Sequence, residues 1–144
     1  MTKVAPIPGF EGRYSATEDG RIISHENYSR KGDRYLTLHA RRDGYVRAVL
    51  CVEGKARTFY VHRLVALAFL PNPKGMPQVN HRNAFKGDNS VKNLEWCSDS
   101  ANKRHAIQIG VRRFDSPRFI ESVRRNVLRA HSVNRAQFQK RKSV

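Results

Sequence analysis

The stretch PQVNHRNAFKGDNSVKNLEWCSDSANKRHA, residues 77–106, indicates the central architecture of this chain, because two short strand-like segments enclose a long polar one. Its thirty residues include five Asn, two His and two Asp, and polar side chains at this density do not build a hydrophobic core. The segments QVNH and LEWC favour β structure, and the residues between them favour hydrogen bonds to their own backbone. We therefore expect two strands that hold a polar loop.

A helix is expected directly after the second strand. Ser98 is a suitable N-cap and Gly110 lies just past the last turn, so the sequence predicts a helix over 99–109. Asn102 and His105 lie three positions apart on this helix, which places Asn102 on the face that would pack against the strands. The complete unit is strand, loop, strand and helix.

The first sixty residues predict an antiparallel, β-rich part. Turn-forming pairs recur at Asp19-Gly20, Asp43-Gly44 and Glu53-Gly54, and three hairpins in succession indicate a meander. In YVRAVLCV, residues 45–52, apolar residues alternate, so one face of the sheet is expected to be buried. The other face carries Arg47, and a twisted basic ribbon of this kind fits a DNA groove, with a plain solvated face as the alternative.

The segment HRLVALAFL, residues 62–70, predicts a short helix that is apolar almost all round and therefore buried. Pro71 and Pro73 follow it and prevent its continuation. His62 and Arg63 lie where the preceding strand joins this helix. They serve either as structural tethers or as phosphate contacts.

Charge points to a nucleic acid partner. Lys and Arg outnumber Asp and Glu by 28 to 12, which gives a formal net charge of +16. The longest apolar run, LVALAFL, is far too short to span a bilayer, so we expect a soluble, intracellular protein. Cys51 and Cys97 form no CxxC pair, which argues against a disulfide framework and a cysteine-ligated zinc site.

The spacing of three polar residues resembles a known family. Asn93 follows His81 by twelve positions and Asn102 follows Asn93 by nine, which resembles the HNH nucleases whose last His is replaced by Asn. The segments VHRLVALAFLPNP, VNH, DNSVKNLEW and SANKRHA are similar to HNH homing endonucleases often encoded by phages and mobile introns. IPGFEGRYSATEDGRIIS, residues 7–24, is similar to the DNA-binding module that commonly precedes this unit. The resemblance covers about residues 6–110.

The resemblance implies a ββα-metal active site that cleaves DNA. His81 matches the general base, a neutral imidazole that takes a proton from the attacking water. Asn93 matches the residue that buttresses the loop and helps to hold the catalytic His. Asn80 and Asn102 match the ligands of one Mg²⁺, or of another divalent cation such as Mn²⁺, which would contact the scissile phosphate.

The loop departs from the pattern of the family. Relatives commonly read NHIDGNKTNN where this chain reads NHRNAFKGDN, so an acid and a glycine are replaced by Asn83 and Ala84, and Phe85 stands where Asn is common. No carboxylate is present at positions 80 or 83. The alternative is therefore an HNH-derived DNA-binding protein with weak or lost cleavage. RNA binding is a more distant alternative.

The expected architecture is α+β in three parts: a β-rich DNA-binding module over 1–58, an HNH ββα-metal unit over 59–110 and a basic helical tail over 111–144. The tail holds ten Lys or Arg against two acids. The expected partner is double-stranded DNA in the cytoplasm, of the host cell if the gene is carried by a phage, with no membrane and no small-molecule cofactor. A nick and a double-strand break both fit, as do a monomer and an oligomer. The residues expected to contact DNA are Arg21, Arg41, Arg42, Arg47, Arg63, Arg82, Lys86, Lys103, Arg124 and Arg125.

Overall fold

The computed structural model describes residues 1–27, 29–108 and 125. Two antiparallel sheets form its N-terminal half. The first contains β1 (Val4–Pro6), β2 (Tyr14–Thr17), β3 (Ile22–Ser24) and β4 (Arg34–Tyr35), in that order. The second contains β5 (His39–Ala40), β6 (Val46–Val52) and β7 (Lys55–Tyr60).

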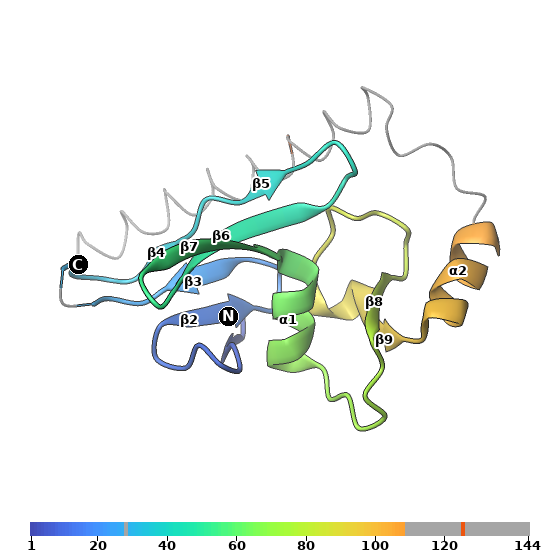
Figure 1. Ribbon diagram of the computed structural model, residues 1–144, viewed down its shortest axis with the longest axis horizontal. Coiled ribbons are helices and arrows are strands. Elements are labelled where there is room, and N and C mark those ends of the chain that lie inside the picture. Colours follow the sequence, from blue (N-terminus) through green and yellow to red (C-terminus); the bar gives the residue numbers. More distant parts are fainter. Residues whose placement is uncertain (28, 109–124, 126–144) are drawn as a thin grey trace.

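The second half is the predicted strand, loop, strand and helix unit, preceded by one helix. Its elements are α1 (Val61–Phe69), β8 (Gln78–His81), the short 3-10 helix η1 (Val91–Asn93), β9 (Leu94–Cys97) and α2 (Asp99–Gln108). Figure 1 shows α1 between the N-terminal sheets and the β8–β9 hairpin, with α2 beyond that hairpin. The predicted α+β class is confirmed.

The three predicted hairpin turns are confirmed, but the single meander is wrong. The turns join β2 to β3, β5 to β6 and β6 to β7. The chain leaves the first sheet after β4, where the Leu36 N–H still bonds to the Ile22 carbonyl at 2.8 Å and Leu38 is buried. Burial of Leu38 in the core carries the chain across to the second sheet.

The alternation in β6 is confirmed, whereas the basic character of its outer face is not. Val46, Ala48 and Leu50 are at most 1% exposed, and the residues between them face outward. Within β6 and β7, which are fully described, the outward pairs are Arg47 with Tyr60, Val49 with Thr58, and Cys51 with Ala56. Arg47 is the only cation among these six residues, so the ribbon has a mostly neutral outer face.

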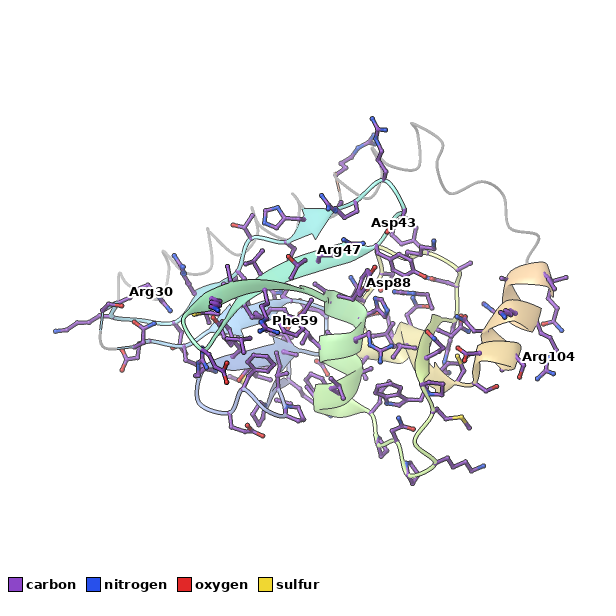
Figure 2. The ribbon with its side chains drawn as sticks, viewed as in Figure 1. Arg30, Asp43, Arg47, Phe59, Asp88 and Arg104 are labelled. Carbon is purple, nitrogen blue, oxygen red and sulfur yellow. The ribbon has the colours of Figure 1, made fainter. Side chains whose placement is uncertain are left out.

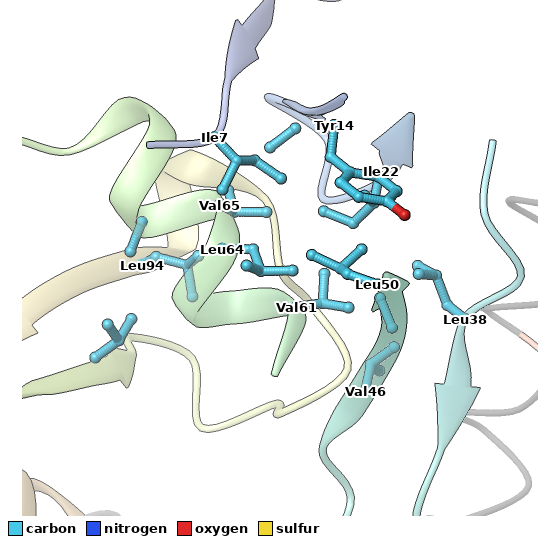
Figure 3. Packing of buried hydrophobic residues seen from close by; sticks show 14 residues of the cluster. Ile7, Tyr14, Ile22, Leu38, Val46, Leu50, Val61, Leu64, Val65 and Leu94 are labelled. Atoms are coloured by element: carbon cyan, nitrogen blue, oxygen red, sulfur yellow. The ribbon is translucent and has the colours of Figure 1, made fainter. Parts of the chain in front are cut away.

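One hydrophobic core joins the two halves. Val61, Leu64 and Val65 of α1 pack between the N-terminal sheets and Leu94 of β9 (Figure 3). The helix begins at Val61, one residue before its predicted start. Leu67 is 47% exposed, which corrects the expectation of burial all round. The sequence predicted a boundary between two domains near residue 58. The hydrophobic core contains residues from both sides of this position and is continuous.

The predicted C-terminal helix lies outside the described residues, apart from the exposed Arg125. The structure describes α2 from Asp99, its predicted first residue, to Gln108, and the predicted last residue, Ile109, lies outside the described residues. None of the helices in the described part of the chain is long and apolar enough to cross a membrane.

Candidate active site

The β8–β9 hairpin and α2 together form a pocket of about 240 Å³. Antiparallel pairing sets Asn80 opposite Glu95 and His81 opposite Leu94, and α2 packs against β8. Ser98 accepts a hydrogen bond from the Ala101 N–H at 3.2 Å and so caps α2, as predicted. The pocket is lined by Tyr45, Val79, Asn80, His81, Ala84, Lys86, Asn102, Lys103, His105 and Ala106. The structure therefore brings together three of the four predicted site residues.

His81 is held as a neutral base. Its Nε2 lies 3.0 Å from Oδ1 of Asn89, and a carbonyl oxygen only accepts, so Nε2 carries the proton. The lone pair is then on Nδ1, which no described group hydrogen-bonds. Burial lowers the pKa of His81, partly opposed by the hydrogen bond to Asn89 and the charge of Asp88. The ring is thus uncharged and able to accept a proton near neutral pH.

Aromatic rings enclose one side of His81. The His62 ring centroid lies 5.0 Å from that of His81, and the Tyr45 centroid lies 6.1 Å away. His62 is only 6% exposed and its Nδ1 has no partner in the described residues. Burial, assisted by the charges of Arg63 and Lys86 and by that of His81 when its ring is protonated, lowers the pKa of His62 to about 3. His62 is therefore a neutral packing wall for the base.

Asn93 closes the loop and does not line the pocket. Its Oδ1 accepts from the Asn83 N–H at 3.0 Å, and its Nδ2 donates to the Asp88 carbonyl at 2.8 Å. Its own carbonyl accepts from the Arg82 N–H at 2.8 Å. Asn93 is 6% exposed, so these bonds are shielded from water. The arrangement fits the buttressing role that the sequence predicts.

The residues that depart from the family pattern keep this loop closed. Asn83 Nδ2 donates to Asp88 Oδ2 at 3.0 Å, and Asn83 Oδ1 accepts from the Phe85 N–H at 2.8 Å. Ala84 has φ of +62°, in the left-handed region where a glycine is unstrained. A side chain there costs roughly 1–2 kcal/mol. The loop is thus closed by hydrogen bonds and strained at one residue.

The two predicted metal ligands are neutral amides with available oxygens. Asn80 Nδ2 donates to Glu95 Oε1 at 2.9 Å, which leaves Asn80 Oδ1 without a described hydrogen-bond partner. Asn102 also makes no side-chain hydrogen bond to a described residue. The described residues contain no group of three His, Cys, Asp or Glu side chains that could hold a metal ion. Two amide oxygens suit Mg²⁺, which retains most of its waters and also binds substrate phosphate.

Two of the arginines expected to contact DNA are occupied within the protein. The Arg21 side chain is 11% exposed, pairs with Asp19 at 2.7 Å and stacks 4.4 Å from the Tyr35 ring centre. Arg63 donates to the Pro77 carbonyl at 3.0 Å, which favours the tether over the phosphate contact. The structure argues against DNA contact for Arg21, because its guanidinium is stacked and paired away from solvent.

The other expected contacts differ in their surroundings. Arg41 and Arg42 are exposed at the β5–β6 turn, and the Arg82 side chain is 60% exposed. Lys86 and Lys103 line the pocket, where the Lys86 ammonium donates to the Asp43 carbonyl at 2.9 Å.

Arg47 is partly occupied, since it bonds to Asp43 at 3.2 Å and to the Tyr60 hydroxyl at 2.9 Å. Arg124 lies outside the described residues. Figure 2 shows Arg104 on α2 and Arg30 at opposite ends of the molecule. Arg104 is exposed, whereas Arg30 is partly buried and donates to the Ser24 hydroxyl at 3.0 Å and the His25 carbonyl at 2.7 Å.

Sequence reasoning missed four residues around the site: Asn89, Glu95, Tyr45 and His62. Glu95 could have been found, since residues of paired strands face one another and Asn80 precedes His81 in the first strand. Asn89 carries only a weak signal, because it is one of five Asn in a polar stretch. Tyr45 and His62 lie far from the motif in sequence, and the tether or phosphate contact expected of His62 did not place it beside the base.

A second hydrogen-bonded chain has the connectivity of a hydrolase triad. Ser15 Oγ lies 2.7 Å from His25 Nε2, and His25 Nδ1 lies 2.8 Å from Asp33 Oδ2. Ser15 is 6% exposed in a strand paired on both sides, so a substrate cannot reach its hydroxyl. This chain braces β2 and β3 against the segment before β4.

Comparisons with known proteins match both halves of the described chain. A family model described as the NUMOD4 motif matches residues 5–51. A second family model, described as HNH endonuclease, matches residues 59–104. The second match includes all four residues assigned to the candidate site. The first extends from β1 into β6, and most of β7 lies between the two matches.

Two curated relatives are each 34% identical to this chain over the aligned residues. DNA endonuclease I-HmuI of Bacillus phage SP01 is 34% identical over 104 residues, 72% of this chain and 57% of the relative. An uncharacterized HNH endonuclease of Acanthamoeba polyphaga mimivirus is 34% identical over 95 residues, 66% of this chain and 27% of the relative. The chain therefore spans less than two thirds of the length of either relative.

A solved structure supports the same similarity. It describes DNA binding and cleavage by the HNH homing endonuclease I-HmuI and matches with a TM-score of 0.63 at 32% sequence identity. The match covers 76% of this chain and 60% of the solved one.

Proposed function

The chain belongs to the HNH homing endonuclease family, and we propose that it cleaves DNA by metal-dependent hydrolysis of a phosphodiester bond in the pocket between β8 and α2. The family resemblance predicted from the spacing of His81, Asn93 and Asn102 is thereby confirmed. One observation carries the proposal: His81 is uncharged and presents Nδ1, with no described hydrogen-bond partner, in a pocket that also contains Asn80 and Asn102.

His81 acts as the general base. Its Nδ1 takes a proton from the water that attacks phosphorus, and the bond from phosphorus to the leaving oxygen then breaks. The imidazolium that forms keeps its Nε2–H bond to Asn89 and is stabilised by the nearby charge of Asp88. Asn93 holds the loop closed around this ring and does not contact the reacting atoms.

Asn80 and Asn102 are the residues that would hold the metal ion. HNH endonucleases generally depend on a divalent metal, and we propose Mg²⁺ or a similar hard cation such as Mn²⁺. When bound, the ion stabilises negative charge on the phosphoryl group and on the leaving oxygen. Glu95 orients Asn80 through its Nδ2, so that the amide oxygen remains available.

DNA is the partner, and we propose that it is double-stranded. Arg41, Arg42 and Arg82 are exposed, and Lys103 lines the pocket, so phosphates near the site meet cations from both halves of the chain. These side chains position the duplex and carry little sequence information of their own.

A second candidate function is a DNA-binding protein that retains the fold with weak or lost cleavage. Two observations favour it: both metal ligands are neutral amides, and the loop is strained at Ala84. Neutral oxygens attract a hard cation less strongly than carboxylates do. Tight binding without cleavage would support this candidate.

A plasmid-relaxation assay separates the two candidates. The parent should convert supercoiled plasmid to nicked or linear DNA with Mg²⁺ and should not do so with EDTA. His81→Ala should lower the rate by roughly 10² to 10⁴ with nearly unchanged DNA affinity, because it removes proton transfer only. His39→Ala, an exposed histidine on β5, is the matched control and should cut like the parent. Cleavage by His81→Ala at the parent rate would refute the assignment.

A further inference from the structure

The turn between β2 and β3 touches the catalytic loop through the backbone. Gly20 has φ of +88°, and a Cβ placed on it would lie 2.8 Å from the carbonyl carbon and oxygen of Asn89 and 2.9 Å from its Cβ. No real Cβ contact is that close, and these neighbours are mainly backbone atoms that cannot rotate away. The absence of a side chain at Gly20 is therefore required by the position of Asn89.

A hydrogen bond between neighbouring residues also holds the turn against the catalytic loop. The Val91 N–H donates to the Glu18 carbonyl at 2.9 Å. The turn itself is rigid, since the Gly20 N–H donates to the Thr17 carbonyl at 3.0 Å and Asp19 pairs with Arg21. Residues 18–20 thus form a firm platform for residues 89–91 of the catalytic loop.

Asn89 transmits this contact to the base. Its Oδ1 accepts from His81 Nε2 at 3.0 Å, and each residue is only 5% exposed. A hydrogen bond weakens steeply as its length and angle depart from these values. A shift of Asn89 by a few tenths of an ångström would therefore loosen the bond that fixes which nitrogen of His81 carries the proton.

We propose that the Glu18–Gly20 turn of the N-terminal sheet fixes the orientation and tautomer of His81 by seating Asn89. Asn89 is then a positioning residue, and the N-terminal module is a structural part of the active site as well as a DNA-binding element. The effect on cleavage rests on the proposed endonuclease function. The effect on the tautomer does not.

The first experiment compares Gly20→Ala with Gly9→Ala. Gly9 has φ of +85°, and a Cβ there meets nothing within 4 Å, so both variants carry the same backbone strain and only one displaces Asn89. Single-turnover nicking at saturating DNA should fall about 10- to 100-fold in Gly20→Ala, because misplacing a catalytic group slows the chemical step. DNA affinity should be unchanged, and Gly9→Ala should cut like the parent. Equal rates in the two variants would overturn the proposal.

The second experiment reads the tautomer by imidazole ¹⁵N NMR at pH 8, with no DNA present. The parent and Gly9→Ala should show the proton of His81 on Nε2, and Gly20→Ala should show a mixture of tautomers. The same mixture is expected for Asn89→Leu, which lacks the acceptor, whereas Asn89→Asp keeps an acceptor oxygen and should retain the parent pattern. An unchanged tautomer in both Gly20→Ala and Asn89→Leu would refute positioning.

The two readouts keep the proposals separate. A parent that does not cut refutes the proposed function, and the tautomer measurement then decides the positioning role alone. If the Gly20→Ala chain fails to fold, the tautomers of His81 in Asn89→Leu and Asn89→Asp test whether Asn89 positions the base. In an Asn89→Leu background, Gly20→Ala should lower the nicking rate no further, and an additional fall would contradict the proposed path.

Discussion

The β6–β7 ribbon and the β8–β9 hairpin are ordered by different forces. The ribbon alternates strictly, and its inward residues Val46, Ala48 and Leu50 are almost fully buried in the shared core. The hairpin has strands of four residues, and its loop is held by amide groups such as those of Asn83 and Asn93. Apolar packing is non-directional and tolerates small shifts, whereas hydrogen bonds fix angles as well as distances. The proposed active site therefore lies in the region that is held by directional bonds.

The largest expected change in stability is in the ribbon. Leu50→Ala removes a fully buried side chain and should lower the free energy of unfolding by about 2–5 kcal/mol, as measured by urea denaturation. The nicking rate per folded molecule should be unchanged, since Leu50 does not line the pocket.

The counterpart is Asn93→Ala in the hairpin. It removes two loop hydrogen bonds and should cost about 1–3 kcal/mol of stability, yet it should also lower the nicking rate at saturating DNA. If Leu50→Ala lowers the rate per folded molecule as strongly as Asn93→Ala does, the division between the two regions is wrong.

The next effect is a loss of folding stability at low pH, caused by His62, which lies between the ribbon and the hairpin. The pKa of His62 is lowered to about 3 in the fold, against about 6.5 in the unfolded chain, so the unfolded state binds more protons between these values. Stability from this residue is present above pH 6.5 and is lost as pH falls. The loss should reach about 2 kcal/mol at pH 5, at about 1.4 kcal/mol per pH unit.

His62→Phe keeps a ring in this position and cannot titrate. Urea denaturation from pH 7 to pH 5 should therefore show a smaller loss of stability in the variant than in the parent. Identical pH profiles would show that His62 is not buried as a neutral ring.

A third effect concerns the charge at the metal ligands. Asn80→Asp replaces the bond to Glu95 by two carboxylates in contact, so the hairpin should lose about 1–2 kcal/mol in EDTA. Mg²⁺ should recover this loss, because a charged oxygen binds a hard cation more strongly than an amide does. The measurement is the increase in melting temperature with Mg²⁺, which should be larger in the variant than in the parent.

Glu95→Gln combined with Asn80→Asp provides the control, since it removes the repulsion and keeps the new carboxylate. Its melting temperature in EDTA should return toward that of the parent. An Asn80→Asp chain that responds to Mg²⁺ no more than the parent would remove Asn80 from the metal site.

The smallest effect is relief of strain in the loop. Ala84→Gly should raise the free energy of unfolding by about 0.5–1 kcal/mol, because glycine adopts the left-handed conformation without penalty but loses more entropy on folding. Thermal denaturation should show the gain, and a decrease would mean that the Ala84 side chain contributes packing that exceeds its strain.

The features that the sequence predicted correctly are those set by residues close together in the chain. The three hairpin turns and the strands QVNH and LEWC depend on neighbouring residues, so turn chemistry and alternation were sufficient. Asn80, His81 and Asn102 were placed by spacing, and the structure brings them to one pocket.

Long-range contacts explain what the sequence did not predict. Arg21 was expected on DNA, but its guanidinium stacks on Tyr35 from another strand, and Asn89 meets Gly20 across 69 positions of sequence. Such contacts depend on the final packing of separate elements, which no local pattern encodes.

The continuous core around α1 limits how this chain can be recombined with its relatives. A chimera joined near residue 58 would exchange Ile7, Ile22 and Leu50 while keeping Val65 and Leu94, and these side chains pack in one cluster. The same joint would also exchange the turn that supports Asn89. A chimera that keeps this core and the support of Asn89 should therefore inherit residues 1–108 as one block.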